Sequence, residues 1–169
     1  MPQNVEIKAR VAHPDALLAK ARRLTGAEPE IIRQTDTFFA TARGRLKLRQ
    51  FADGAGELIA YDRPDDRGPK TSRYAIARCD DAAAMKDLLE HLLGATGTVE
   101  KTRRLLLTGR TRIHLDDVRD LGSFMELEVV LTAGESQQDG QQEAQAIMAA
   151  LGIDPKDLVQ GAYLDLQER

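Results

Sequence analysis

Apolar and polar residues alternate strictly along the stretch from residue 4 to residue 11. The apolar positions are Val5, Ile7, Ala9 and Val11, and the polar positions are Asn4, Glu6, Lys8 and Arg10. A repeat of two residues is typical of a β-strand with two different faces. We therefore predict a strand here, with one face packed on a core and the other carrying a carboxylate, an ammonium and a guanidinium in a row.

The same alternation recurs along the rest of the chain. It predicts strands over residues 30–39, 45–51, 57–63, 71–78, 98–108, 112–118 and 124–131. Apolar residues at helical spacing predict helices over residues 15–24, 80–93 and 141–151, while 134–140 reads as a polar loop. Residues 152–169 read as a short tail that could add a final helical turn or an edge segment. No linker long enough to divide domains interrupts this order. We expect one α+β domain spanning residues 1–169.

Composition narrows the classes of protein that fit. Charged residues make up 30% of the 169 residues, yet the formal net charge is only -3. A nucleic-acid binder usually has a basic excess, so no nucleic-acid partner is expected. The single Cys79 fits a reducing compartment, no apolar run approaches the ~20 residues of a membrane-spanning helix, and the first strand leaves no room for a signal peptide. We expect a soluble, cytoplasmic protein without a membrane partner; a homodimer remains open.

The polar faces of the predicted strands carry many charges. The cations are Lys8, Arg10, Arg45, Lys47, Arg49, Arg63, Lys101, Arg103 and Arg112, and the anions are Glu6, Glu57, Asp116, Glu126 and Glu128. On an open sheet these faces would be solvated, and each charge would contribute little. In a closed barrel with its apolar faces turned outward against helices, the same charges would line the interior.

A charged interior is tolerable if it is wet and if opposite charges gather into separate sites. Arg and Lys clusters suit a polyanion, because arginine binds phosphate oxygens in a bidentate manner and lysine offers a point charge. A carboxylate cluster suits Mg²⁺, which takes carboxylates, waters and substrate phosphates. The pattern therefore indicates a metal-bound polyphosphate, with phosphoryl or nucleotidyl transfer as the reaction class.

Several motifs, in this order along nearly the whole chain, resemble one known family. They are NVEIKARV at 4–11, QTDTFF at 34–39, GRLKLR at 44–49, LIAYDRP at 58–64, GPKTSRY at 68–74, RIHLD at 112–116, GSFMELE at 122–128 and GAYLDL at 161–166. The first resembles the ExExK strand of the CYTH superfamily. These are the triphosphate tunnel metalloenzymes, which include class IV adenylyl cyclases and thiamine triphosphatases, and the cyclase-like branch fits best.

The resemblance implies an eight-stranded antiparallel β-barrel, the triphosphate tunnel, with helices packed outside. It implies Mg²⁺ or Mn²⁺ as cofactor, held by Glu6, Asp116, Glu126 and Glu128. The implied triphosphate-binding residues are Lys8, Arg10, Lys47, Arg49, Arg63, Lys70, Lys101, Arg103 and Arg112, and the implied catalytic residues are Lys8, Glu6 and Glu126. The resemblance also assigns Glu57 and Tyr61 to this site. Asn4 departs from the family because it replaces the first glutamate of ExExK, and it brings an oxygen without a charge.

Two reactions fit this resemblance. Attack by the ribose 3′-hydroxyl of ATP on the α-phosphorus would give cyclic AMP and pyrophosphate. Attack by water would hydrolyse thiamine triphosphate, a nucleoside triphosphate or inorganic tripolyphosphate. Because of Asn4, a non-catalytic module that binds polyphosphate or a nucleotide is the alternative. His114 could act as a general base, since its unperturbed pKa lies near neutrality, but we interpret it as a hydrogen-bonded structural residue. No adenine pocket can be identified from the sequence.

Overall fold

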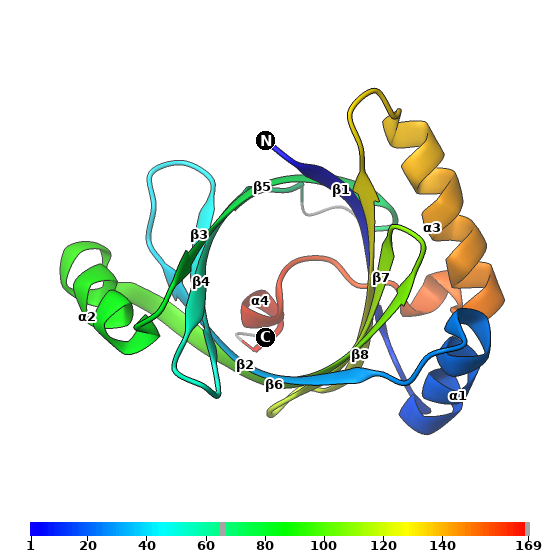
Figure 1. The fold of residues 1–169 in the computed structure, drawn as a ribbon, viewed down its shortest axis with the longest axis horizontal. Helices are drawn as coiled ribbons and strands as arrows, with labels where there is room; N and C mark the ends of the chain where they lie inside the picture. Colours follow the sequence, from blue (N-terminus) through cyan, green and yellow to red (C-terminus); the bar gives the residue numbers. More distant parts are fainter. Residues whose placement is uncertain (65–66, 168–169) are drawn as a thin grey trace.

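A closed antiparallel barrel of eight strands forms the protein (Figure 1). The computed structural model describes residues 1–64 and 67–167. Around the barrel the strands follow the order β1-β5-β4-β3-β2-β6-β7-β8. Their bounds are β1 Gln3–Arg10, β2 Glu30–Phe39, β3 Arg45–Phe51, β4 Gly56–Asp62, β5 Lys70–Cys79, β6 Ala95–Thr108, β7 Thr111–Val118 and β8 Gly122–Leu131. The predicted eight-stranded antiparallel barrel is confirmed.

The main apolar core lies outside this barrel, between its wall and two helices. The outward residues of β1, Val5, Ile7 and Ala9, have no exposed surface. They pack in one cluster with apolar residues of α1 (Pro14–Thr25) and α3 (Gln137–Leu151). Figure 1 shows these two helices together on one side of the ring and α2 (Ala82–Leu93) on the other. Because the apolar faces are used outside, the polar faces of the strands turn into the barrel.

The third helix begins earlier than the sequence pattern predicts. We expected residues 134–140 to be a loop, but α3 starts at Gln137. Ser136 and Asp139 form a capping box that fixes this start. Glycine is needed at position 140 of the helix, because a Cβ there would come within 2.7 Å of Leu131 and 2.8 Å of Val5. The sequence shows no apolar residue at this contact, because the helix meets the barrel here through a glycine, which has no side chain.

The C-terminal segment covers one end of the barrel. It contains a 3₁₀ turn, Pro155–Asp157, and the short helix α4, Tyr163–Gln167, which projects onto the middle of the ring in Figure 1. The amide of Val159 donates to the carbonyl of Lys8 at the end of β1. Tyr163 packs with residues at the adjoining strand ends, namely Val99, Val118 and Phe124. From the sequence this segment was expected to be a short tail that could add a final helical turn, and α4 is such a turn.

Within residues 1–64 and 67–167, none of the helices combines the length and the apolar character needed to span a bilayer.

Candidate functional site

A cavity of about 760 Å³ occupies the inside of the barrel. Alternate residues of all eight strands line it, together with Ala162 and Tyr163 from the C-terminal segment. Among the described residues, its wall includes eight Lys or Arg side chains and six carboxylates. At the end opposite α4 the cavity reaches exposed residues such as Ile76 and Arg78. The charged faces found in the sequence therefore line a tunnel that is open at one end.

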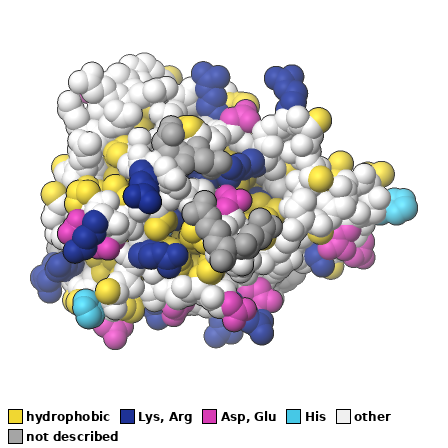
Figure 2. All heavy atoms as spheres, turned by 180° about the vertical axis from the view of Figure 1, so that it is seen from behind, with side chains coloured by type: hydrophobic (Ala, Val, Ile, Leu, Met, Phe, Trp, Pro, Cys, Tyr) yellow, Lys and Arg dark blue, Asp and Glu magenta, His cyan; other side chains and the backbone are white. Residues whose placement is uncertain are grey.

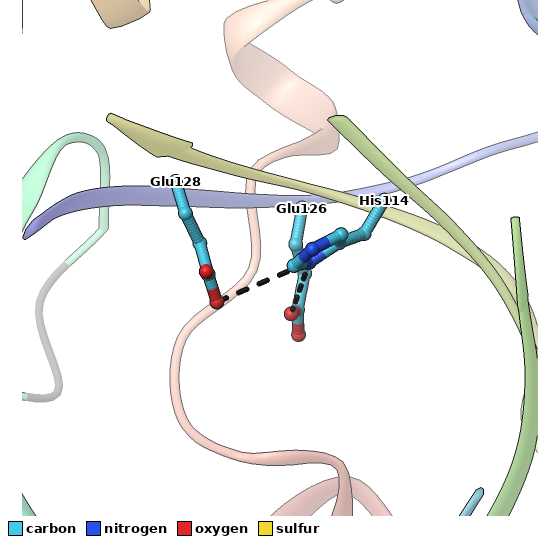
Figure 3. A group of neighbouring side chains, drawn as sticks. All are labelled: His114, Glu126 and Glu128. Carbon is cyan, nitrogen blue, oxygen red and sulfur yellow. Dashed lines mark ion pairs between the residues drawn. The ribbon is translucent and has the colours of Figure 1, made fainter. Parts of the chain in front are cut away.

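An imidazole and two carboxylates converge on one side of this tunnel. His114 of β7 pairs with Glu126 of β8, and Glu128 follows on the same face of β8 (Figure 3). Nδ1 of His114 lies 3.7 Å from Oε2 of Glu126 and 3.9 Å from Oε1 of Glu128. One ligand atom from each residue lies within 4.8 Å of the others. This is a spacing at which the three side chains could share one metal ion.

His114 is placed as a metal ligand would be. It is 4% exposed, and its Nδ1 has no hydrogen-bond partner. Burial, followed by the nearby guanidinium of Arg103, lowers the pKa of His114. The neutral imidazole is therefore favoured, which is the form that binds metals. Sequence reasoning treated this residue as structural, because a lone histidine on a strand gives no indication of what it faces.

The acidic group continues onto β1. Glu6 pairs in register with Glu128, and its Oε2 accepts a 3.0 Å hydrogen bond from Arg63. Burial raises the pKa of Glu6, and the neighbouring Glu128 raises it further. Asn4, two residues earlier on the same face, is 3% exposed, and its Oδ1 has no partner. This side of the tunnel thus offers a further carboxylate and an unpaired amide oxygen.

Lys8 lies at the covered end of this acidic group. Its Nζ lies 3.3 Å from Oε1 of Glu126 and donates to the carbonyl of Gly161 at 3.0 Å. The ring of Tyr163 lies 4.0 Å from the same nitrogen. Burial lowers the pKa of Lys8 to about 8, although the charge of Glu126 opposes this. Lys8 is therefore a cation that can lose its proton close to neutral pH.

Asp116 holds two cations on the neighbouring wall. Arg103 donates to it through Nε and Nη2, both at 2.7 Å, and Nζ of Lys101 lies 3.3 Å away. Tyr163 also donates its hydroxyl to Asp116 at 3.0 Å. Burial opposes ionisation, but Lys101 and Arg103 hold the pKa of Asp116 below its usual range. Asp116 is not among the three residues whose ligand atoms lie within 4.8 Å of one another, and its oxygens accept these bonds instead.

A second carboxylate holds the cations of β3. Asp36 accepts hydrogen bonds from Nε and Nη2 of Arg49 at 2.8 and 2.9 Å and from Nζ of Lys47 at 3.0 Å. Burial opposes its ionisation, but Arg49 and Lys47 hold the pKa of Asp36 well below its usual range. Sequence analysis missed Asp36 as a site residue. The alternation of Gln34, Asp36 and Phe38 along β2 was the signal that could have identified it.

The remaining predicted residues lie at different places. Arg63 and Arg112 line the tunnel, as do Glu57 and Tyr61. Lys70 is buried at the start of β5, in register with Glu6. Arg10 is exposed, and its guanidinium lies 5.0 Å from the centre of the Phe124 ring. The structure does not place Arg10 along the cavity, because Phe124 and Tyr163 fill the covered end of the barrel there.

The outer surface has a different distribution of charge. On the face shown in Figure 2, basic and acidic side chains lie interspersed. Inside the tunnel, three of the six lining carboxylates lie together on β1 and β8, and the other three lie on β2 and β4. Lys47, Arg49, Lys101 and Arg103 lie on β3 and β6. A group of carboxylates on β1 and β8 therefore lies inside the tunnel.

Comparison with known proteins agrees with this geometry. The sequence matches the CYTH domain over residues 2–163. The chain belongs to the CYTH domain family. The resemblance seen in the sequence motifs is thereby confirmed. A comparison with curated proteins gave no match.

Solved structures share the CYTH barrel. The PH1012 protein of Pyrococcus horikoshii is 22% identical, with a TM-score of 0.85 over 96% of this chain and 98% of that chain. A candidate adenylate cyclase of Vibrio parahaemolyticus is 18% identical, with a TM-score of 0.82 over 100% of both chains. HpAC1 of Hippeastrum, a candidate adenylyl cyclase described as having a dominant triphosphatase activity, is 15% identical, with a TM-score of 0.63 over 89% of this chain and 88% of that chain. At these identities the similarity establishes the fold.

Proposed function

We propose that this CYTH protein is a divalent-metal-dependent enzyme that acts on a triphosphate inside the tunnel. One observation carries the proposal. Inside a single cavity of about 760 Å³, a group of carboxylates with an unpaired imidazole lies beside clustered lysines and arginines. This arrangement suits a polyphosphate with its metal ion, since each half of the complex finds the opposite charge.

The arginines keep hydrogen-bonding capacity for a ligand. Arg49 uses Nε and Nη2 on Asp36, and Arg103 uses the same two atoms on Asp116 and Glu126. Within the described residues, Nη1 of both arginines makes no hydrogen bond. The carboxylates therefore fix the direction of each guanidinium while leaving donors for phosphate oxygens. Lys47, Lys101, Arg63 and Arg112 add positive charge elsewhere in the cavity lining.

The residues present fit a divalent ion. His114, Glu126 and Glu128 would hold it, with Glu6 and Asn4 adjacent on β1. The unpaired, buried Nδ1 of His114 supports this assignment, because a buried polar atom without a partner is otherwise unfavourable. When bound, Mg²⁺ or Mn²⁺ would neutralise charge that develops on the phosphoryl oxygens.

Two reactions remain candidates. A ribose hydroxyl of ATP could attack the α-phosphorus to give cyclic AMP and pyrophosphate, or water could attack a phosphoryl group of an organic or inorganic triphosphate. In either case Lys8 is our candidate acceptor for the proton of the attacking oxygen, since its pKa of about 8 leaves about a tenth of it neutral at pH 7. Similarity to a candidate adenylate cyclase and to HpAC1 supports both possibilities.

The test is a turnover assay with ATP, thiamine triphosphate and tripolyphosphate, each with Mg²⁺ or Mn²⁺. Cyclic AMP with pyrophosphate would identify a cyclase, and phosphate release a triphosphatase. The double substitution Glu126→Gln and Glu128→Gln should abolish either activity while the barrel stays folded, as judged by circular dichroism. Glu100→Gln, on the outer face of β6, is the matched control and should change nothing. Full activity of the double variant would refute the metal assignment.

A non-catalytic binding module is the second candidate, and Asn4 favours it. The neutral amide removes one negative charge beside Glu6 and Glu128, which weakens attraction for a second ion. Binding of a triphosphate by calorimetry without turnover of any of the three substrates would support the module. Restoring a carboxylate with Asn4→Glu should then produce turnover if the missing charge is the cause.

A further inference from the structure

Helix α2 turns an apolar line of side chains toward solvent. Leu88 is 60% exposed and Leu92 is 74% exposed, and because they are four residues apart they lie on the same side of the helix. Ala84 continues this line by one turn and is also exposed. Lys86 and Glu90 form an ion pair at 3.2 Å on a different side of α2. We call Ala84, Leu88 and Leu92 the α2 ridge, and an apolar line of this kind is normally packed against another element.

The outer face of β4 and β5 is apolar as well, and no helix lies on it. Alternate residues of these strands line the cavity, so the residues between them face outward. Leu58 pairs with Ala77 and Ala60 with Ala75. The three alanines are exposed and Leu58 is partly exposed. We call these four residues the β4–β5 shelf.

The rest of the barrel exterior is covered by helices. Within residues 1–64 and 67–167, α1 packs on β6 and β7, α2 on β3 and β2, and α3 on β8 and β1. Figure 1 shows α2 and α3 on opposite sides of the ring and no helix outside β5. Val5 of β1 and Leu48 of β3, the neighbour of Leu58, have no exposed surface. The β4–β5 shelf therefore has the composition of a covered sheet face without the cover, and exposed apolar patches of this kind mark interaction sites.

The ridge and the shelf are complementary in shape. Leucines project from the helix, whereas the three alanines leave room above the sheet, and large side chains facing small ones let two layers interdigitate. The two surfaces also adjoin, because a Cβ on Gly56, at the start of β4, would come within 2.7 Å of Ala82, the first residue of α2. Under a two-fold axis the ridge of each copy can therefore lie on the shelf of the other, so that the same contact forms twice.

We propose that the α2 ridge and the β4–β5 shelf form the interface of a reversible homodimer, in which α2 of each copy packs on the shelf of the other. A second copy is the occupant that fits, because the chain itself supplies the helix that its shelf lacks. A membrane surface fits less well, since neither the ridge nor the shelf contains a lysine or arginine to meet anionic lipids. The dimer involves the outside of the barrel and does not depend on what the tunnel binds.

The size of the interface predicts its strength. Helix α2 has 12 residues and is therefore about 18 Å long and about 10 Å wide. Two helix-on-sheet contacts of this size place the interface at the low end of the range for specific complexes. We therefore expect a dissociation constant of roughly micromolar order, so that both monomer and dimer can be observed.

Sedimentation equilibrium of the full chain, over about a hundredfold range of concentration around this value, is the test. The mass of the wild type should rise from that of one copy to that of two. Leu92→Glu on the ridge and Ala75→Lys on the shelf should each raise the dissociation constant about a hundredfold, because each buries an unpaired charge twice in the interface. Combined in one chain, the two substitutions should recover roughly tenfold of this loss, since each new carboxylate then meets the new ammonium of the other copy.

Both positions are exposed in the monomer, so each variant should keep the circular dichroism spectrum of the wild type. Leu88→Gln is a milder second variant of the ridge and should raise the dissociation constant roughly tenfold. Ile31→Glu is the matched control, because Ile31 is 66% exposed but belongs to neither surface, and it should leave the dimer unchanged. A wild type with the mass of one copy at every concentration would overturn the proposal. So would a dimer that Leu92→Glu dissociates but Ala75→Lys does not, because the helices would then pack on each other and not on the shelf.

Discussion

Replacement of Asp36 by asparagine tests whether Asp36 occupies hydrogen-bond donors of Arg49 and Lys47 that a polyanion could otherwise use. Asp36 is 2% exposed and accepts three charge-assisted hydrogen bonds from Arg49 and Lys47. Asn keeps the size of the side chain and one acceptor oxygen, but it leaves two buried cations without a counter-charge. Removing one partner of a buried ion pair costs about 3–5 kcal/mol.

We take about 3 kcal/mol for Asp36→Asn, because one acceptor remains and the tunnel can admit water. In a protein of this length, each kcal/mol corresponds to about 2–4 °C, so the melting temperature should fall by about 6–12 °C. The same change frees donors of Arg49 and Lys47 and removes a negative charge from the cavity. Affinity for tripolyphosphate should consequently rise roughly tenfold.

Differential scanning fluorimetry with and without tripolyphosphate measures both effects. The variant should melt lower than the wild type without ligand and should gain more degrees on addition of tripolyphosphate. Asp87→Asn makes the same charge change on the exposed face of α2 and serves as the control. A variant that is as stable as the wild type would contradict the loss of a buried ion pair, and one that gains less from tripolyphosphate would contradict competition between Asp36 and the ligand for these cations.

Three further predictions concern other parts of the tunnel. His114→Gln should weaken Mn²⁺ binding about tenfold or more and remove the ¹⁴N coupling from the electron spin echo spectrum of bound Mn²⁺; a retained coupling would exclude the imidazole as ligand. Burial, with help from Arg103, lowers the pKa of Lys101 to about 8. Because Lys101 loses its charge as pH rises through 8, the Kd for tripolyphosphate should rise about tenfold between pH 8 and pH 9.5, and the rise should be smaller in Lys101→Met, where Lys8 still has a pKa of about 8. Tyr163→Phe removes the hydroxyl that donates to Asp116, and urea unfolding should show a loss of about 1–2 kcal/mol, whereas an unchanged stability would count against this contact.

Strand faces and the barrel could be anticipated from the sequence because alternation is local. Val5 and Ile7 lie on one face and Glu6 and Lys8 on the other in any strand, whatever surrounds it. At Gly140 the local pattern predicted a loop, but α3 passes through it. Only the close approach of β1 and β8 explains why glycine stands inside this helix.

Which residues make up the site could not be predicted from the alternation. The alternation placed Asp116 and Glu126 on inward faces, but it could not say that Asp116 would be occupied by Arg103 and Lys101. It also gave no weight to Asp36 or His114, which acquire a role only through residues on other strands.

Periodicity and motif order by themselves determined a charged, two-faced strand set and the family to which it belongs. The closed barrel alone decided which charges meet, because register across eight strands joins residues that lie as far apart as Lys8 and Glu126. It also decided that the C-terminal segment, whose GAYLDL motif says nothing of its place, covers one end and brings Tyr163 to Asp116. Pairing energies in a buried tunnel depend on distances between strands, and those distances exist only after the sheet has closed.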